Sequence, residues 1–317
     1  MMTKTIRTGL VLSAGGVRGV YAHSGILQAI DGMDIRPSAI AGCSAGAIVG
    51  GIHASGTPLD QWLEALTHME RKNFWQPGTW GRAIRELLIH RGRNFTGVAK
   101  TDAPLDFCRR NIAVDTFEDC HIPFHAVATS LATGKKVMFS QGDLSLGIAA
   151  SATIPLLYQP VEIEGSFYCD GGVIDLAPTD AICCRHELDV LFVHHVATRT
   201  KGFHGIHSNA GNGWPILEII DTLLFRGRPW YLSDSPLTFR RCPCGCKALI
   251  VVLEPSLPEL PWPQTEHGPD VQAAAKRQAE ELLGPYLEIL RHDPSQLLDQ
   301  ALPPATTPLE GGSCVKA

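Results

Sequence analysis

Short apolar runs alternate with helical patterns along the first part of the chain. Residues 7–13 and 38–42 are rich in apolar side chains and short enough to be buried strands. A glycine-rich turn at 14–19 opens a helix that reaches about residue 30, and the small residues at 45–55 predict a second helix. Two strand-turn-helix units in a row imply a parallel sheet with helices on its faces. We therefore expect an α/β fold with three layers, α/β/α, around a mostly parallel central sheet.

Later segments continue this pattern. Trp62, Leu63, Leu66 and Met69 fall on one side of an amphipathic helix predicted at 60–71. Further strands are predicted at 122–129, 137–140, 161–169 (with a hairpin turn), 188–196 and 249–253, and further helices at 146–152, 215–226 and 271–291.

One main domain is predicted to span residues 1–255. It includes a cap-like segment at about 73–95 and a Cys-rich insertion at about 200–247. A helical C-terminal extension is expected at 256–302 and a disordered tail at 303–317.

Composition narrows the class of protein. Of the 317 residues, 44% are hydrophobic and 19% are charged, as in a globular protein with a sizeable core. The formal net charge of -5 argues against a nucleic-acid binder, which needs a basic surface to neutralise phosphates. Residues 1–14 lack an apolar run long enough for a signal peptide, and 40–52 is shorter than the roughly 20 residues of a spanning helix. We expect a soluble, cytoplasmic protein that meets membranes only at their surface.

Residues 42–46 carry the strongest chemical pattern. Their sequence, Gly-Cys-Ser-Ala-Gly, is a G-x-S-x-G motif between a predicted strand and a predicted helix. A serine in that setting sits on a sharp turn that needs glycine on either side, here Gly42 and Gly46, and its hydroxyl projects above the sheet. The following helix directs its dipole and free N–H groups toward that oxygen. Ser44 is therefore the candidate nucleophile; the alternative is a small-residue turn required only for packing.

A second glycine-rich turn, Ser-Ala-Gly-Gly-Val-Arg-Gly at 13–19, also lies between a strand and a helix. Consecutive glycines let several backbone N–H groups point into one concavity, which suits a phosphate or an oxyanion. The alternative is a dinucleotide-binding turn, which requires an acidic residue at the end of the second strand. That strand ends in the serine turn and Asp34 lies before it, so the anion-binding loop is the better interpretation.

The third pattern is Asp170 followed by Gly171 and Gly172, after a strand that bears aromatic residues. Paired glycines permit a tight turn that exposes the carboxylate at a sheet edge, although Asp-Gly alone is a common turn sequence. In their order and type the three patterns resemble the patatin-like phospholipase family, which has a glycine loop followed by arginine, a G-x-S-x-G serine and an Asp-Gly-Gly or Asp-Gly-Ala aspartate. Residues 150–155, Ala-Ser-Ala-Thr-Ile-Pro, are similar to the segment that precedes the aspartate strand in that family. The resemblance covers about residues 7–253.

This resemblance implies a Ser-Asp dyad that works without a histidine. Ser44 would attack an ester carbonyl while Asp170 accepts the hydroxyl proton. Arg18 would either attract a phosphate head group or anchor its loop by pairing with a carboxylate, and we favour the anchor. The oxyanion hole implied by the family motif comprises Gly15, Gly16 and Val17, and the rest of the anion loop Arg18 and Gly19.

Two positions depart from the family pattern. Ala14 stands where the family usually has glycine, which could narrow the oxyanion loop. Leu176 stands where the family often has asparagine, which could loosen the support of Asp170. Neither change removes a reacting group.

The function implied by the resemblance is that of a lipid acyl hydrolase, of the phospholipase A or lysophospholipase type, with a lipid or fatty-acyl ester as substrate and no cofactor. A non-lipid carboxylesterase and a catalytically silent lipid-binding protein of the same fold are the alternatives. Which ester is cleaved, and whether a protein partner is needed, stays open.

A Ser-His-Asp triad is a second enzymatic interpretation, with His194 or His195 at a strand end as the base. In α/β-hydrolases several strands normally precede the serine turn, whereas only two precede Ser44, so that fold fits poorly. His23, in the helix after the glycine loop, is expected to be a packed or surface residue.

The ten cysteines are scattered as in a protein of a reducing compartment. Cys242, Cys244 and Cys246 form the one candidate metal cluster in the sequence. Their spacing is tighter than that of ordinary zinc knuckles, and no fourth ligand lies close in sequence unless His204 or His207 supplies it. We favour an inert Cys-rich turn and expect no metal.

Aromatic and basic side chains in irregular segments offer a contact surface for acyl chains or lipid head groups, with core packing or a solvated helix face as the ordinary alternative. The aromatic candidates are Phe74, Trp75, Trp80, Trp214, Trp230 and Trp262, and the basic ones Arg82, Arg85, Arg91 and Arg93.

Overall fold

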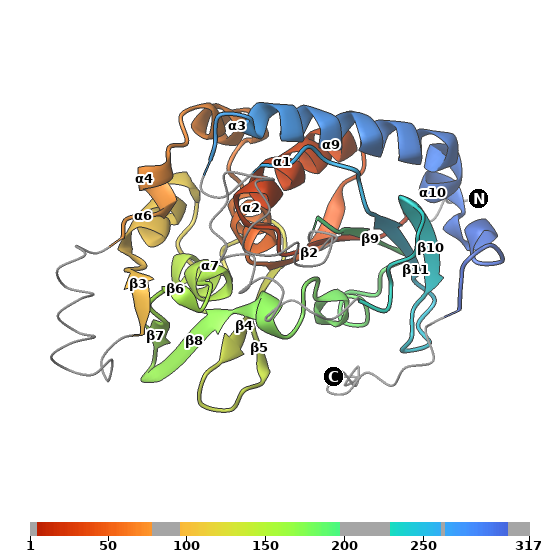
Figure 1. Ribbon diagram of the computed structural model, residues 1–317. Helices are drawn as coiled ribbons and strands as arrows, with labels where there is room; N and C mark the ends of the chain where they lie inside the picture. Colours follow the sequence, from red (N-terminus) through yellow and green to blue (C-terminus); the bar gives the residue numbers. More distant parts are fainter. Residues whose placement is uncertain (1–4, 78–95, 197–228, 261–263, 304–317) are drawn as a thin grey trace, which may run out of the picture.

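A mixed sheet with a parallel centre forms the middle of the molecule (Figure 1). The computed structural model describes residues 5–77, 96–196, 229–260 and 264–303. In these ranges the sheet runs in the order β10-β11-β9-β1-β2-β4-β8-β7, and β5 pairs with β4. Its strands are β1 (Thr8–Leu12), β2 (Pro37–Cys43), β4 (Phe124–Ser130), β5 (Lys136–Phe139), β7 (Val161–Ile163), β8 (Ser166–Asp170), β9 (Val190–His194), β10 (Leu237–Arg241) and β11 (Leu249–Leu253).

Strands β11, β9, β1, β2 and β4 are parallel, whereas β10, β5, β8 and β7 pair antiparallel at the two sides. Because parallel strands end at the same edge, the residues that follow β1 and β2 lie next to each other. On β4, Val127 pairs with Cys43 of β2, and the next residue, Ala128, pairs with Asp170 of the antiparallel β8. The sheet therefore brings the ends of β2 and β8 together.

The helices are α1 (Gly16–Gly32), α2 (Ala45–Ala54), α3 (Leu59–Thr67), α4 (Arg71–Phe74), α6 (Asp102–Asn111), α7 (Leu144–Ala152), α9 (Gly268–Leu283) and α10 (Leu287–His292). Figure 1 shows α1 and α2 over one face of the sheet, with α9 lying along α1. A small separate sheet pairs β3 (Gly97–Ala99) with β6 (Leu156–Tyr158).

Alternating side chains of the strands build two apolar cores, one on each face of the sheet. Leu10 and Leu12 of β1 belong to the core under α1, α2 and α9, while Val11 belongs to the core on the other face. Val271 and Leu283 of α9 are part of the first core. Helix α9 thus packs on the same core as the first strand.

Several elements differ from the predicted ones. The helix predicted at 271–291 is broken after Leu283 by a 3-10 turn over Gly284–Tyr286, because Pro285 lacks the N–H that a continuous helix needs. The helix predicted at 60–71 ends at Thr67. Strand β10, at the sheet edge, lies inside the segment predicted as a Cys-rich insertion. The helix predicted at 215–226 lies outside the described residues, as do 78–95 of the cap-like segment, 200–228 of the insertion and 304–317 of the tail.

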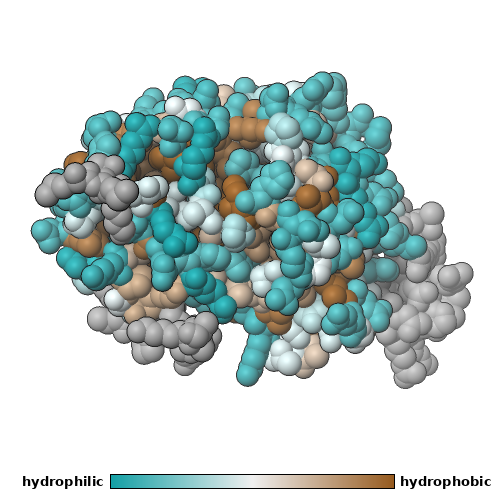
Figure 2. Space-filling view, turned by 180° about the vertical axis from the view of Figure 1, so that it is seen from behind, coloured by the Kyte–Doolittle hydropathy of each residue, from teal (hydrophilic) through white to brown (hydrophobic). Residues whose placement is uncertain are grey.

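The described helices include none that combines the length and the hydrophobicity of a bilayer-spanning segment. Seen from the opposite side, the surface is mostly polar, and apolar side chains show between the polar ones (Figure 2).

Candidate active site

Ser44 occupies a strained turn between β2 and α2. Its φ of 54° and ψ of -118° lie where residues with a side chain are rarely found. The side chain is 5% exposed, and α2 begins at the next residue. This is the geometry that a G-x-S-x-G motif gives a nucleophile, with the hydroxyl above the sheet at a helix N-terminus.

The two glycines of the motif are required by close packing of backbone on backbone. A Cβ at Gly42 would lie 2.3 Å from the carbonyl oxygen of Gly46, and a Cβ at Gly46 would lie 2.1 Å from that of Leu12. The Gly46 N–H donates to the Ser13 carbonyl at 3.1 Å. The turn that carries Ser44 is therefore locked onto the end of β1.

Asp170 ends β8 with its side chain fully buried. Its Oδ1 accepts a hydrogen bond from the Gly172 N–H at 2.8 Å, which caps the short 3-10 helix over Gly171–Val173. Its backbone N–H donates to the Thr153 carbonyl at 2.8 Å. Gly171 has no room for a side chain, since a Cβ there would lie 2.1 Å from the Val127 carbonyl oxygen.

Burial raises the pKa of Asp170 to about 6, because the charged form loses its water. Hydrogen-bond interactions with Ser44, Gly172 and Cys43 act in the opposite direction and lower it. A carboxyl with a pKa in this range is a stronger base than an exposed aspartate and is still ionised at neutral pH.

Ser44 and Asp170 lie beside each other, but their contact is loose. Oδ2 of Asp170 has no partner at normal hydrogen-bond distance among the described residues. Catalytic hydrogen bonds often tighten only when substrate binds.

The glycine loop at the start of α1 presents unused donors. The amides of Gly15, Gly16 and Val17 donate to no acceptor in the described part of the chain, as is usual in the first turn of a helix. Gly16 adopts the left-handed φ of 56°, and nothing lies within 4 Å of a Cβ placed there, so backbone conformation explains this glycine. The loop can receive a negatively charged oxygen.

Close packing sets this loop against the serine turn. A Cβ at Gly19 would lie 2.8 Å from the Cβ of Ala45, and one at Gly15 would lie 2.8 Å from the Cα of Gly19. The loop is also tied to the aspartate turn, since the Ala14 N–H donates to the Leu176 carbonyl at 2.7 Å. Ala14 and Leu176, the two departures from the family pattern, are thus joined by a backbone hydrogen bond, which does not depend on their side chains.

Arg18 is turned toward the C-terminal part of the chain. Its Nη2 donates to the Leu257 carbonyl at 3.2 Å. Burial lowers the pKa of Arg18, and the nearby Glu259 carboxylate raises it. The hydrogen bond is thus made to a backbone carbonyl, and not to a carboxylate as the anchor expected from the sequence would be.

Ser151 supports the serine turn in a way that the sequence does not reveal. Its Oγ accepts a hydrogen bond from the Ser44 N–H at 3.0 Å and donates to the Val127 carbonyl at 2.6 Å. It is fully buried in α7. The motif at 150–155 contains Ser151, but only the fold shows that its side chain fixes the Ser44 backbone.

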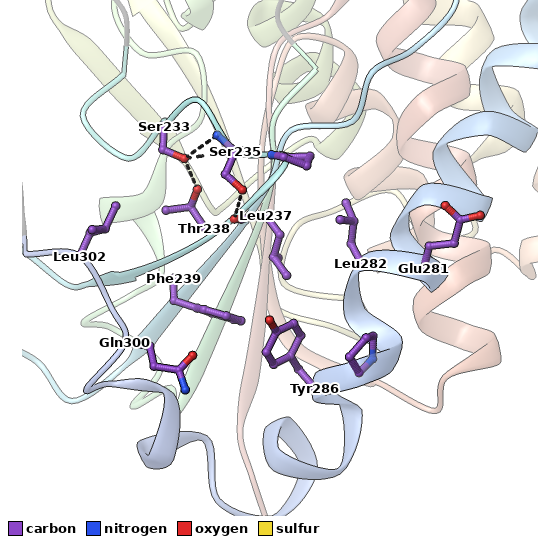
Figure 3. A pocket seen from close by; sticks show the side chains of 12 residues that line it. Ser233, Ser235, Leu237, Thr238, Phe239, Glu281, Leu282, Tyr286, Gln300 and Leu302 are labelled. Carbon is purple, nitrogen blue, oxygen red and sulfur yellow. Dashed lines mark hydrogen bonds between the residues drawn. The ribbon is translucent and has the colours of Figure 1, made fainter.

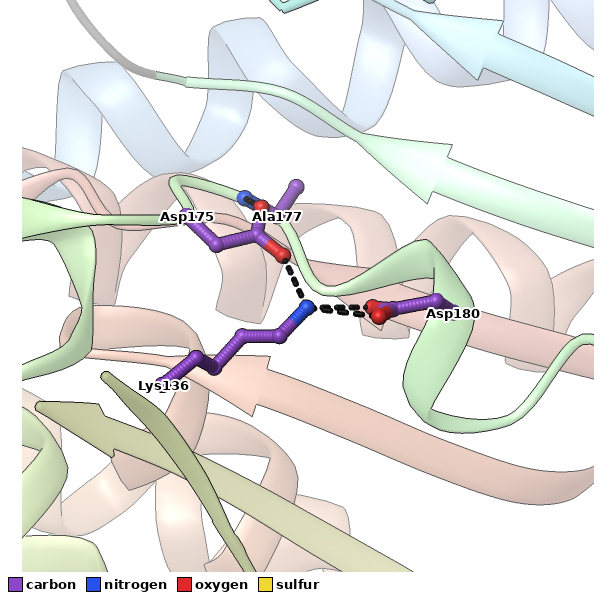
Figure 4. Close-up of polar contacts among 4 residues, drawn as sticks. All are labelled: Lys136, Asp175, Ala177 and Asp180. Atoms are coloured by element: carbon purple, nitrogen blue, oxygen red, sulfur yellow. Dashed lines mark hydrogen bonds and ion pairs between the residues drawn. The ribbon is translucent and has the colours of Figure 1, made fainter. Parts of the chain in front are cut away.

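A second group missed from the sequence fixes the segment that follows Asp170 (Figure 4). Lys136 Nζ on β5 lies 2.9 Å from Asp175 Oδ2 and 2.6 Å from Asp180 Oδ2, and these side chains are about a quarter exposed. The three residues are far apart in sequence and carry no motif. The ion pairs hold the aspartate turn against the β4–β5 hairpin.

The histidines proposed for a triad have other partners. His194 Nδ1 lies 2.8 Å from His23 Nδ1, and His23 Nε2 lies 2.8 Å from the Ser13 carbonyl oxygen. His195 Nδ1 contacts the Tyr231 hydroxyl at 3.1 Å. Burial lowers the pKa of all three, to about 3 for His23 and about 4 for His195. His23 is a packed residue, and no histidine in the described ranges bonds to Ser44.

An open pocket lies away from these residues, between the edge strand β10 and α9 (Figure 3). The rings of Phe239 and Tyr286 pack edge to face in its wall, and Ser233, Ser235 and Thr238 line its upper rim. Neither Ser44 nor Asp170 contributes to its walls.

The aromatic residues considered for lipid contact have mixed positions. Trp75 is buried against Tyr158, and Phe74 and Trp230 are partly buried. Outside the described residues lie Trp80, Trp214 and Trp262, the four arginines Arg82, Arg85, Arg91 and Arg93, and the histidines His204 and His207.

Two relatives of known sequence match more than half of this chain. An uncharacterized NTE family protein of Mycobacterium bovis is 37% identical over 172 residues, which are 54% of this chain and 44% of that protein. Lysophospholipase NTE1 of Cryptococcus neoformans is 31% identical over 191 residues, which are 58% of this chain and 11% of that protein. The chain therefore spans less than half the length of these relatives.

The fold is shared with human GIVD cytosolic phospholipase A2, with a TM-score of 0.53 and 10% sequence identity over 91% of this chain and 60% of that one. The sequence profile of the patatin-like phospholipases matches residues 10–182, a segment that contains the glycine loop, Ser44 and Asp170. This chain belongs to the patatin-like phospholipase family.

Proposed function

We propose that this chain is a serine lipid acyl hydrolase of the phospholipase A or lysophospholipase type, with residues 1–255 as its catalytic domain. The observation that carries the proposal is the strained Ser44 turn beside a fully buried Asp170 with a raised pKa. A buried carboxylate without a cationic partner is costly and is retained chiefly at functional sites.

In the first step Ser44 Oγ attacks the ester carbonyl carbon, and Asp170 Oδ2 accepts the hydroxyl proton. The carbonyl oxygen becomes an oxyanion that the free amides of Gly15 and Gly16 can receive. One such donor is worth roughly 3 to 4 kcal/mol in serine proteases. The alcohol then leaves with the proton from Asp170, and an acyl ester on Ser44 remains.

In the second step water attacks the acyl ester. Asp170 accepts a proton from that water, the same amides hold the second oxyanion, and the fatty acid leaves as the Ser44 hydroxyl is restored. Ser151 keeps the Ser44 backbone in register throughout, because its hydrogen bond fixes the amide of the nucleophile.

A lipid substrate is supported by the relatives named as lysophospholipases, and exposed apolar side chains fit such a substrate. Leu156 and Val98, on paired strands of the small sheet, and Ile174, in the aspartate turn, are exposed apolar side chains. Leu156 also has a left-handed φ of 69°. Such side chains suit contact with acyl chains or a membrane surface.

The direct test is release of fatty acid from lysophosphatidylcholine micelles, with a medium-chain p-nitrophenyl ester assayed in parallel. Ser44→Ala and Asp170→Asn should each lower kcat by at least about a thousandfold. Ser38→Ala is the control: Ser38 lies on β2, its hydroxyl donates to the Thr8 carbonyl, and its loss should leave kcat unchanged.

Cleavage of the p-nitrophenyl ester but of no lipid would identify a non-lipid esterase. Binding of lipid without turnover of either substrate would identify a lipid-binding protein and refute the hydrolase. Full activity of Asp170→Asn would refute the dyad.

A further inference from the structure

Five cysteines from two distant segments meet at one end of the sheet. Cys183 and Cys184 follow the 3-10 turn Thr179–Ala181 after the aspartate turn, and the other three occupy the connection between β10 and β11. All five Sγ atoms lie within 4.8 Å of one another. We call this group the thiol cluster; its members are Cys183, Cys184, Cys242, Cys244 and Cys246.

Two distances in the thiol cluster match those around a single tetrahedral ion, whereas the Cys242 and Cys244 sulfurs, at 2.7 Å, would have to move apart by about 1 Å on binding it. With zinc–sulfur bonds of about 2.3 Å, the sulfurs of a tetrahedral site stand roughly 3.8 Å apart. The Sγ of Cys183 lies 3.7 Å from that of Cys242 and 3.9 Å from that of Cys244. The Cys246 thiol interacts with those of Cys183, Cys242 and Cys244.

Disulfide bonds do not account for this arrangement. The Sγ atoms of Cys242 and Cys244 are 2.7 Å apart and those of Cys183 and Cys184 are 3.3 Å apart, beyond the roughly 2.05 Å of a disulfide. Each of these pairs is also separated by at most one residue, which makes the ring of a disulfide small and strained.

The backbone around the thiol cluster is built to bring the sulfurs together. Gly245 takes a left-handed φ of 73°, and its N–H donates to the Cys242 carbonyl at 3.1 Å, which folds the connection into a tight turn. Cys183 and Cys242 are 3% and 5% exposed and belong to the apolar core on that face of the sheet. An ion there would be shielded from water on one side.

From this geometry we propose a zinc site in which Cys183, Cys242, Cys244 and Cys246 are the four ligands. Each thiol releases its proton to solvent on binding, and four thiolates around Zn²⁺ leave a net charge of -2. Thiolates in a tetrahedral set favour zinc over harder cations. We choose Cys183 over Cys184 as the ligand because Cys183 is buried and its Sγ lies at the distance of a tetrahedral edge from those of Cys242 and Cys244. Cys184 then lies next to the site without binding the ion.

The site revises the interpretation of the sequence, which favoured an inert turn because no fourth ligand lay nearby. The fold supplies that ligand from 59 residues away. A closed set of four ligands leaves no position for water or substrate, so the role is structural. The ion would clamp the β10–β11 hairpin to the segment that carries the aspartate turn, and this role does not depend on the reaction at Ser44.

Metal content of the purified full chain tests the proposal. Elemental analysis should find about one zinc ion per chain. Cys242→Ser and Cys183→Ser should lower that value to background, whereas Cys184→Ser and Cys120→Ser should retain it; Cys120 is half-buried and lies outside the cluster. Loss of zinc in Cys184→Ser with retention in Cys183→Ser would overturn the ligand assignment.

A measurement on the wild-type chain keeps the test valid if a variant fails to fold. After removal of metal by a chelator under reducing conditions, Co²⁺ should produce thiolate-to-cobalt charge-transfer absorption that saturates at about one equivalent and that Zn²⁺ abolishes. A chain that arrives without zinc and gives no such absorption, or that carries iron instead, would contradict the proposal.

Discussion

The carboxylate of Asp170 is held out of water by the strands around it, and this burial sets both its basicity and its cost to the fold. The pKa rises because burial disfavours the charged form. An ionised Asp170 is therefore useful to the reaction and unfavourable to stability at the same pH.

The pH dependence of the rate follows from this pKa. The dyad needs Asp170 ionised, so kcat/KM should rise as pH increases through about 6 and then level off. A rate profile between pH 4.5 and 8 measures the midpoint of that rise. A midpoint near 4, that of an ordinary aspartate, would show that burial does not tune the base.

The free energy of unfolding should fall as pH rises, whereas kcat/KM rises. Folding raises the pKa of Asp170 from 3.8 to about 6. A group with a raised pKa in the folded state destabilises that state as pH rises through this interval, and the loss at neutral pH is roughly 3 kcal/mol. Asp170→Asn should therefore raise the free energy of unfolding at pH 7 by up to about 3 kcal/mol while activity is lost. Urea denaturation at pH 7 and pH 4 checks this expectation, because the gain should vanish where wild-type Asp170 is protonated.

Ser44 and Asp170 were proposed as the dyad from local motifs, whereas Ser151 and Lys136 were not assigned a role. The motifs are visible because glycines must flank a strained serine and follow a turning aspartate. Ser151 and Lys136 act on residues that only the fold brings near them. Common residue types without a spacing rule give no such signal in one sequence.

At the scale of elements, α1 and α9 approach so closely that glycine is required on α1. A Cβ at Gly25 would lie 2.3 Å from the carbonyl oxygen of Gln272, whereas nothing lies within 4 Å of one at Gly32 on the same helix. Gly25→Ala should lower the free energy of unfolding by about 1 to 3 kcal/mol despite the better helix propensity of alanine.

Gly32→Ala is the matched control and should leave stability unchanged or raise it by up to about 1 kcal/mol. Thermal and urea denaturation compare the two variants. Equal stability of both would contradict the packing of α9 on α1.

Another element-scale expectation concerns the ion pairs of Lys136. Lys136→Met leaves two carboxylates facing each other, so the free energy of unfolding should fall by about 1 to 3 kcal/mol at pH 7, less than for fully buried pairs. The pKa of Asp175 is already raised by burial, so the deficit should shrink as pH falls and the Asp175 carboxyl is protonated.

Lys135→Met, at the exposed neighbouring position, controls for the loss of a charge. Urea denaturation at pH 7 and pH 5 compares the two variants. If both substitutions have the same effect, the ion pairs do not support the aspartate turn.

Elements with a strong apolar pattern were predictable, and those without one were not. Strand β11 was predicted with its observed bounds, and β1 and β2 to within about a residue at each end. Strand β10, with two arginines, and α6, which is largely polar, carry little apolar pattern. An edge strand needs only one buried face, so its sequence resembles that of a loop.

At the scale of the whole molecule, the order of strands brings three distant segments to one place. The glycine loop follows β1, Ser44 follows β2 and Asp170 ends β8, and the sheet order sets these ends near one another. The α/β class followed from the strand-turn-helix units, as did the parallel centre of the sheet. The pairing of β8 with β4 and the meeting of the cysteines did not, because a long-range contact depends on the complete fold.

The central claim is that Ser44 is the nucleophile of this fold, and covalent capture tests it most directly. A long-chain alkyl fluorophosphonate should add once per chain, and peptide mass spectrometry should place the adduct on Ser44, with fatty-acid release lost in proportion. Ser44→Ala should not react, and Ser38→Ala should react as the wild type does. An adduct on another residue, or an unmodified Ser44 in a fully inhibited protein, would contradict the account.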